Sequence, residues 1–263
     1  MTDDLGSPHL RFERVRSVGW CTVDRPEARN ALTSAMYLGV RRAVDLVNRD
    51  PDLAALVITG VGDVFIPGGE MSGRHDDGNQ EFIEVIGYDV LPFRTIRNSR
   101  APVVSAVNGI CQGGGLIIAM LSDIAVASDR ATFRAPETLR GVVDVNLAAM
   151  LPAHVGIAYA RDLLMSGRRL DADEACRLGL VSRVVSHDDV QRAAHDAVGE
   201  LLRAAPGARS RVKSLINARY GVVDDIGFQI SVESEEVVEG FQAFTEKRMP
   251  NWVPEEFRTG GRA

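Results

Sequence analysis

The sequence predicts an α/β fold with a helical C-terminal part, and three observations lead to this prediction. Apolar runs typical of buried strands alternate with helical patterns up to residue 127, and after residue 148 the pattern becomes mostly helical. Strands that alternate with helices pair in parallel through crossover connections. The chain has 263 residues, of which 45% are hydrophobic, so it is long enough to bury a sizeable core.

The first elements are predicted from alternation, capping and apolar runs. Alternation over residues 10–15 and 18–23 predicts a hairpin. Thr33 is a favoured N-cap residue and apolar residues follow it near helical spacing, so a helix is expected over 34–48. The further elements expected before residue 100 are a buried strand over 53–59, a glycine-punctuated loop over 60–73 and a helix over 82–96.

The segment from residue 101 to 140 contains a glycine triplet, Gly113 to Gly115, where a strand gives way to a helix. Backbone N–H groups at a helix start have no partners inside the helix, and the helix dipole places partial positive charge there. Glycines let a substrate approach this backbone closely, which suits the binding of an oxyanion. The elements expected around the triplet are a strand over 103–107, a helix over 114–121, a strand over 124–127 and a loop that carries Glu137.

The C-terminal part is predicted to be mainly helical. We divide the chain into a core over 1–200 and a C-terminal helical region over 201–263. The elements expected after residue 150 are helices over 156–166 and 171–178, a strand over 181–185, and helices over 188–204, 208–218 and 225–247.

Composition and missing motifs exclude several classes of function. A formal charge of −6 argues against nucleic acid as the main partner. No apolar run is long enough to span a membrane, and the acidic N-terminus lacks an apolar signal region, so a cytoplasmic protein is expected. No His, Cys or Asp cluster has metal-ligand spacing, and G-x-G-x-x-G is absent, so neither a metal nor a dinucleotide cofactor is expected.

Six segments follow one another along nearly the whole chain: DRPEARNALT (24–33), GDVFIPGGEM (62–71), SAVNGICQGGGL (105–116), SDIAVASDRATFRAPE (122–137), LMSGRRLDADEACRLGLVSRVV (164–185) and FQAFTEKRMPNW (241–252). In this order they resemble the crotonase superfamily, also called the enoyl-CoA hydratase/isomerase family. This resemblance implies a crotonase-like core of ββα units forming a spiral, and C-terminal helices that form a homotrimer, often as a dimer of trimers. It also implies an acyl-CoA thioester as substrate, so that coenzyme A arrives with the substrate and no separate cofactor is needed.

The resemblance assigns an oxyanion hole to two backbone amides, those of Gly69 and Gly114. Pro67 departs from the small residue usual in the family, but it removes its own N–H and leaves that of Gly69 two residues on. The alternative is structural: Gly68 and Gly69 make a tight turn, and the triplet allows close packing of strand against helix.

The acids depart from the family pattern. A typical hydratase of the family uses two glutamates. One matches Glu137, while the position of the other holds Ile117, so standard two-glutamate hydration is expected to be impaired. Asp144 is a candidate second acid or base, and the alternative is that it only caps the following helix. Glu137 is expected to have a raised pKa, and its alternative is a surface loop carboxylate.

The remaining site candidates bind substrate. Ala28 and Arg29 match the family's CoA-contacting segment, and Lys247 lies on the helix that reaches CoA in relatives; an exposed loop charge is the alternative for Arg29. An apolar acyl pocket is expected to include Ile117, Met71, Ile86, Phe93 and Leu147.

Enolate-type chemistry is expected, either double-bond isomerisation or an atypical hydration of an unsaturated acyl-CoA. Two other reactions use the same oxyanion hole: C–C hydrolysis of a β-diketone-like substrate and decarboxylation of a malonyl-type CoA ester. A different class, a non-catalytic protein that binds CoA esters, also stays open.

Overall fold

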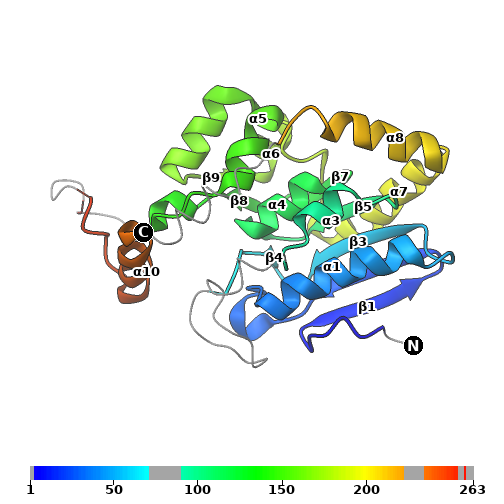
Figure 1. Ribbon diagram of the computed structural model, residues 1–263, viewed down its shortest axis with the longest axis horizontal. Coiled ribbons are helices and arrows are strands. Elements are labelled where there is room, and N and C mark those ends of the chain that lie inside the picture. Colours follow the sequence, from blue (N-terminus) through cyan, green and yellow to red (C-terminus); the bar gives the residue numbers. More distant parts are fainter. Residues whose placement is uncertain (1–2, 71–89, 222–233, 254–257, 259–263) are drawn as a thin grey trace.

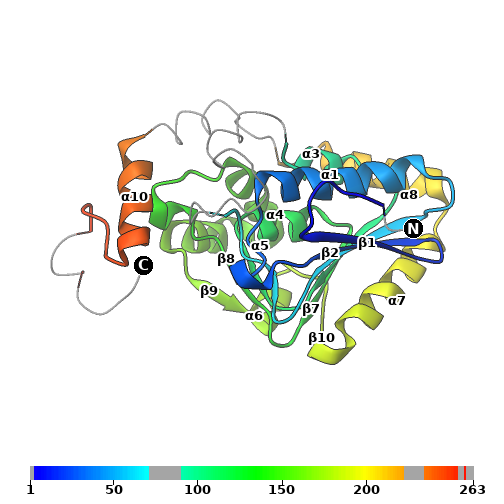
Figure 2. The same ribbon diagram turned by 90° about the horizontal axis from the view of Figure 1, so that it is seen from below.

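The computed structural model describes residues 3–70, 90–221, 234–253 and 258. Within them the chain forms a larger sheet of six strands, with helices on both faces (Figures 1 and 2). Its order is β1-β2-β3-β5-β7-β10, and all neighbours are parallel except the hairpin of β1 with β2. The strands are β1 (Leu10–Val15), β2 (Val18–Val23), β3 (Ala55–Gly60), β5 (Val103–Val107), β7 (Ile124–Ser128) and β10 (Arg183–Val185).

A smaller sheet of short strands lies beside the first, in the order β4-β6-β8-β9. Strands β3, β5 and β7 of the larger sheet are each followed along the chain by a strand of the smaller one, which gives ββ units. The α/β prediction is therefore confirmed, but these strands were missed, because three residues are too few to show a periodicity. The strands are β4 (Val64–Ile66), β6 (Ile110–Gln112), β8 (Thr132–Arg134) and β9 (Arg169–Asp171).

The predicted helices are largely confirmed. The Thr33 side chain accepts a hydrogen bond from the Met36 amide, as the cap prediction requires. The helices predicted over 82–96 and 225–247 lie partly outside the described residues. The helices are α1 (Ser34–Arg49), α3 (Phe93–Arg97), α4 (Gly114–Leu121), α5 (Val145–Ser166, with non-helical backbone at Gly156), α6 (Ala172–Arg177), α7 (Val190–Leu202), α8 (Pro206–Asn217) and α10 (Glu235–Glu246), with 3₁₀ turns η1 (Pro26–Ala28), η2 (Glu137–Arg140) and η3 (His187–Asp189).

The larger sheet separates two apolar cores. Leu56 and Ile58 of β3 belong to the core that contains the buried face of α1, while Ala55 and Val57 belong to the core beneath α7. Figure 2 shows α1 and α7 on opposite sides of the sheet. Because successive side chains of a strand point to opposite faces, a strand covered on both faces is apolar throughout, which explains the continuous apolar run of β3.

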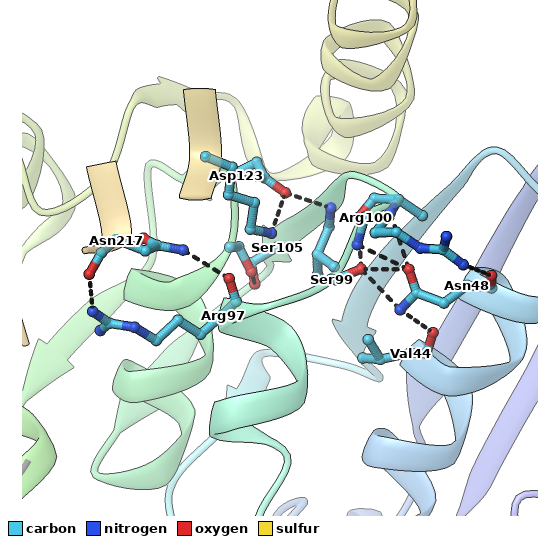
Figure 3. Close-up of polar contacts among 12 residues, drawn as sticks. Val44, Asn48, Arg97, Ser99, Arg100, Ser105, Asp123 and Asn217 are labelled. Atoms are coloured by element: carbon cyan, nitrogen blue, oxygen red, sulfur yellow. Dashed lines mark hydrogen bonds and ion pairs between the residues drawn. The ribbon is translucent and has the colours of Figure 1, made fainter. Parts of the chain in front are cut away.

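Helix α8 is attached to the core by polar contacts (Figure 3). Lys213 Nζ forms an ion pair with Asp123 Oδ2 at 2.9 Å, and Asn217 Nδ2 donates to the carbonyl of Arg97 at 2.7 Å. Nearby, the Asn48 side chain accepts hydrogen bonds from the amides of Arg100 and Ala101, which joins α1 to the segment before β5. These contacts fix the segments that lead into the strands of the central sheet.

Helix α10 packs against η2, the turn that begins with Glu137. A Cβ placed on Gly240 of α10 would lie 2.2 Å from the carbonyl oxygen of Arg140, so the two backbones are in contact. The Arg140 guanidinium lies 4.6 Å from the centroid of the Phe244 ring. Among the described residues, no helix is long and apolar enough to cross a membrane.

Candidate active site

The glycine turn at the start of α4 is closely packed against its neighbours. Gly113, the N-cap, has φ 52° and ψ −122°, and a Cβ there would stand 2.4 Å from Glu137 Oε1. A Cβ on Gly115 would stand 2.1 Å from the carbonyl oxygen of Ile66. Close packing of strand against helix therefore explains Gly115, while the space over Gly113 is occupied by a carboxylate.

The loop after β4 is held by a two-residue bridge to Leu32. The Leu32 amide donates to the Gly68 carbonyl at 3.0 Å, and the Glu70 amide donates to the Leu32 carbonyl at 2.8 Å. These two hydrogen bonds involve the residues on either side of Gly69, and the N–H of Gly69 itself takes part in neither of them. In the part of the chain that the structure describes, no loop, turn or cap hydrogen bond starts at the amide of Gly69 or Gly114.

The loop after β4 lies against the glycine turn. The Cα of Gly68 lies 3.7 Å from the position of a Cβ on Gly113. Gly68 has φ 113°, a conformation that L side chains rarely adopt, and Pro67 precedes it. Gly69 and Gly114 are thus next to two glycines that are in close approach, which is the arrangement that a pair of converging amide donors requires.

A buried ion pair supports the loop after β4. The Arg25 side chain is fully buried, and its Nη1 lies 2.7 Å from Glu70 Oε2 and 3.1 Å from the carbonyl of Ala31. Sequence analysis missed this pair, because both residues stand in polar segments where exposed charges are usual. Because a buried charge is stable only when it is paired, the contact fixes Glu70 and hence the end of the loop that contains Gly69.

Glu137 is enclosed at the glycine turn. Its Oε2 is buried and has no hydrogen-bond partner among the described residues. Burial, and then the neighbouring charge of Asp144, raises the pKa of Glu137 to about 8. A carboxyl group in this state holds its proton near neutral pH and exchanges it easily, as a proton shuttle must. The residue as a whole is half-buried, and the burial of Oε2 favours the site interpretation over that of a surface loop carboxylate.

Asp144 caps α5 and also lies close enough to affect Glu137. Its Oδ1 accepts a hydrogen bond from the Leu147 amide at 2.9 Å, so the cap interpretation is correct. Burial nevertheless raises the pKa of Asp144 to about 6. Hydrogen bonds from the amides of Leu147 and Asn146 act in the opposite direction and lower this pKa. The cap does not remove Asp144 as a candidate acid or base, because its charge still acts on Glu137.

Ile117 brings no polar atom to the site. Its side chain is 1% exposed, and its amide donates to the carbonyl of Gly113 inside the first turn of α4. Phe93 and Leu147, predicted with it to line an acyl pocket, are also buried. Met71 and Ile86, the other predicted lining residues, lie outside the described residues.

The predicted CoA-contacting residues lie at the surface. Ala28 ends η1, and Arg29 follows it with an exposed side chain and φ 52°. Lys247 is the C-cap of α10, exposed and with φ 56°. Among the described contacts, none joins Arg29 or Lys247 to the glycine turn. No group of three metal-ligating side chains is found in the described part of the chain.

Tyr37 of α1 was not predicted as a site residue. Its hydroxyl oxygen would lie 2.1 Å from a Cβ on Gly114, and its ring meets the edge of Phe93 with centroids 6.2 Å apart. Burial raises its pKa, and the charges of Asp144 and Glu137 add to this. The sequence contains one signal that could have identified it: a hydroxyl group on the core face of a predicted helix.

The sequence of the chain is similar to those of known proteins. A sequence model of the family described as enoyl-CoA hydratase/isomerase matches residues 13–255. The chain is 33% identical over 253 residues to a probable enoyl-CoA hydratase of Mycobacterium bovis, with 93% of this chain and 97% of that protein covered. It is 31% identical over 258 residues to carnitinyl-CoA dehydratase of Citrobacter koseri, with 94% and 98% covered.

A solved structure gives the same result for the fold. The enoyl-CoA hydratase/isomerase from Pseudoalteromonas atlantica matches with a TM-score of 0.79 and 32% identity, over 93% of this chain and 100% of that one. The match of the sequence model over 13–255 and the shared fold lead to one conclusion: the chain belongs to the enoyl-CoA hydratase/isomerase family.

Proposed function

We propose that the protein converts an unsaturated acyl-CoA thioester through an enolate, with the amides of Gly69 and Gly114 holding the thioester oxygen and Glu137 moving the proton. One observation supports this most: the Glu137 carboxyl group packs against the glycine turn, with Oε2 buried and without a described partner. Its raised pKa suits a proton shuttle near neutral pH. Coenzyme A belongs to the substrate, so the reaction needs no separate cofactor.

Two amides are the expected source of catalytic power. An enolate oxygen carries more negative charge than the thioester carbonyl from which it forms, so fixed donors stabilise the transition state more than the substrate. Loss of one such donor costs roughly 3–4 kcal/mol. The bridge between Leu32 and the loop after β4 leaves the Gly69 amide outside the local hydrogen bonds, which supports its assignment as one of the two donors.

Isomerisation needs one carboxyl group, which takes a proton from one carbon and returns it to another. Hydration also needs a group that activates water, and Ile117 stands where two-glutamate hydratases carry it. Asp144 is the candidate for that task, since burial raises its pKa and its charge reaches Glu137. Isomerisation is therefore the first choice and an Asp144-assisted, atypical hydration the second. The similar proteins named above are a probable hydratase, a dehydratase and a hydratase/isomerase.

Separate residues are assigned to the CoA part, the thioester and the acyl group of the substrate. Arg29 and Lys247 are exposed cations suited to the phosphates of CoA, and the backbone at Ala28 is suited to its adenine and pantetheine. Pro67 and Gly68 would border the thioester, and Ile117 the acyl group. The apolar surroundings of Ile117 favour an acyl chain over a charged substituent.

A homotrimer or a dimer of trimers is the proposed assembly. Helices α5 and α8 carry large apolar side chains that are about half exposed or more, which is unusual for a free surface. Subunit contacts would cover them. These side chains are Ile157, Tyr159 and Met165 on α5, and Val212, Leu215 and Ile216 on α8.

The test is a panel of 2-enoyl-CoA and 3-enoyl-CoA esters, with wild type against Glu137→Ala and Asp144→Ala. Turnover by wild type and loss of it in Glu137→Ala are expected. Turnover only of β-diketone-like or malonyl-type CoA esters would replace the proposal by C–C hydrolysis or decarboxylation. Binding of CoA esters without any turnover would replace it by a non-catalytic binding protein.

A further inference from the structure

Tyr37 places a buried hydroxyl group against the helix start that contains Gly114. A Cβ on Gly114 would stand 2.1 Å from Tyr37 Oη, so the phenol oxygen occupies the space that any other side chain at this position would need. The tyrosine is 2% exposed, and the edge-on contact with Phe93 fixes the plane of its ring. The oxygen is therefore held in one place, next to the Cα whose own amide is a proposed donor.

The same oxygen lies on the face of α4 where a catalytic acid is missing. Residues three apart on a helix are surface neighbours, so Gly114 and position 117 share a face. Ile117 supplies no polar atom to that face, whereas Tyr37 reaches it from α1. The helix thus keeps a polar group near the glycine turn, although the group comes from another element.

The charges around Tyr37 make it a donor rather than a base. Burial raises its pKa, and the charges of Asp144 and Glu137 raise it further, so the phenol keeps its proton over the whole working range. These two carboxyl groups are the titratable neighbours that affect it. A neutral hydroxyl group beside two carboxyls and a helix start is suited to donate a hydrogen bond to a developing oxyanion.

We propose that Tyr37 Oη is a third hydrogen-bond donor to the thioester oxygen, beside the amides of Gly69 and Gly114. This inference rests on the proposed function, since it requires an enolate at that place. The bond strengthens as negative charge develops on the oxygen, so Tyr37 acts mainly on the transition state. Its removal is expected to lower kcat about 100-fold or more and to leave KM nearly unchanged, as for a lost oxyanion donor.

The decisive variant is Tyr37→Phe, which removes one oxygen and keeps the ring and its contact with Phe93. Tyr220→Phe is the matched control. The Tyr220 hydroxyl donates to Asn217 Oδ1 at a distance of 3.3 Å, and this contact does not involve the glycine turn. The probe is acetoacetyl-CoA, a β-keto thioester whose enolate has its own ultraviolet absorption band. Butyryl-CoA, which forms no stable enolate, reports binding alone. Thermal unfolding of each variant reports the fold.

Wild type and Tyr220→Phe are expected to bind acetoacetyl-CoA largely as the enolate. Tyr37→Phe is expected to show a much weaker enolate band and about 10-fold weaker binding of this ligand, with the affinity for butyryl-CoA unchanged. Incorporation of 3-fluorotyrosine at position 37 provides a second variant that keeps ring and hydroxyl. Because its phenol is more acidic and donates more strongly, it is expected to increase the enolate fraction.

Three results would overturn the inference. An enolate band in Tyr37→Phe equal to that of wild type would remove Tyr37 from the oxyanion site. If Tyr37→Phe lost affinity equally for acetoacetyl-CoA and butyryl-CoA, Tyr37 would have a packing role only. The same conclusion would follow if the 3-fluorotyrosine variant had the same enolate fraction as wild type. Failure of wild type itself to bind acyl-CoA esters would contradict the proposed function as well, so the two failures are distinguishable.

Discussion

Glu137 Oε1 lies directly over the Cα of Gly113, where a Cβ would stand only 2.4 Å away. Strand β8 leads into the turn that begins with Glu137, and strand β6 leads into the glycine turn; β6 and β8 are parallel neighbours in the smaller sheet. Parallel strands bring their carboxyl ends to the same edge, so the pairing itself brings the acid to the helix start.

Gly113→Ala is expected to displace the Glu137 carboxyl group and to lower kcat by about 100-fold or more, since small misplacements of catalytic groups are costly. Gly62→Ala is the matched control: Gly62 also has a positive φ, 66°, but a Cβ there would meet nothing within 4 Å. Both variants should lose about 1–2 kcal/mol of stability from backbone strain. Equal activity of the two variants, measured by steady-state kinetics, would refute the role of this contact.

The pH dependence of kcat/KM distinguishes isomerisation from hydration. To take a proton from carbon, Glu137 must be ionised, and its pKa is raised to about 8. Isomerisation activity should therefore rise with pH up to about that value, whereas hydration, in which a protonated Glu137 delivers the proton, should fall. Asp144→Asn should move this rise or fall of activity toward lower pH, because the charge of Asp144 helps to raise the pKa of Glu137. A flat profile would contradict both reactions.

Folding stability should depend on pH through the same carboxyl group. The pKa of Glu137 is higher in the folded chain than in the unfolded one, so between the two values the folded state binds more protons and stability falls as pH rises. Glu137→Gln removes this effect. Its melting temperature should exceed that of wild type more at about pH 8 than at about pH 5.

Glu200→Gln is the control for that measurement. Glu200 is exposed and paired with Arg183, which lowers its pKa. Glu200 therefore stays ionised between about pH 5 and about pH 8, and its replacement should not change how the melting temperature depends on pH. A difference between Glu137→Gln and wild type that is constant with pH would mean that Glu137 is not buried as described.

Asp144 can be tested for catalysis separately from capping. Asparagine is as good an N-cap as aspartate, so Asp144→Asn should keep stability within about 0.5 kcal/mol, while Asp144→Ala should lose about 1 kcal/mol. Asp171 caps α6 in the same way, through the Glu174 amide, and Asp171→Ala measures the cost of a lost cap away from the site. If Asp144→Asn retains full activity, Asp144 is a cap alone; a kcat reduced about 10-fold or more would assign it an acid or base role.

Local patterns predicted the parts of the fold that depend on local physics. The hairpin, the Thr33 cap and the helix from Gly114 followed from alternation, capping and the glycine turn, and all three are confirmed. The short strands β4 and β8 were missed because three residues are too few to show a periodicity, and only their pairing with β6 makes them strands. Glu137 and Gly113 were both identified, but their contact depends on that pairing and was not.

Other features of the site could not be predicted for the same reason. The Arg25–Glu70 pair joins residues 45 positions apart, and sequence alone does not show that both are buried. Tyr37 appeared as one more residue of an amphipathic helix, since its relevance depends on α1 and α4 meeting at one glycine. Local chemistry therefore identified the candidates, while long-range packing decided which of them meet.

The most direct test of the central claim is proton exchange at carbon. Wild type and Glu137→Gln are incubated with an unsaturated acyl-CoA in deuterium oxide, and the carbon-bound protons of substrate and product are followed by nuclear magnetic resonance. The account predicts deuterium at the α- or γ-carbon with wild type and none above background with Glu137→Gln. Equal incorporation by both proteins, or product formed as fast by Glu137→Gln as by wild type, would contradict it.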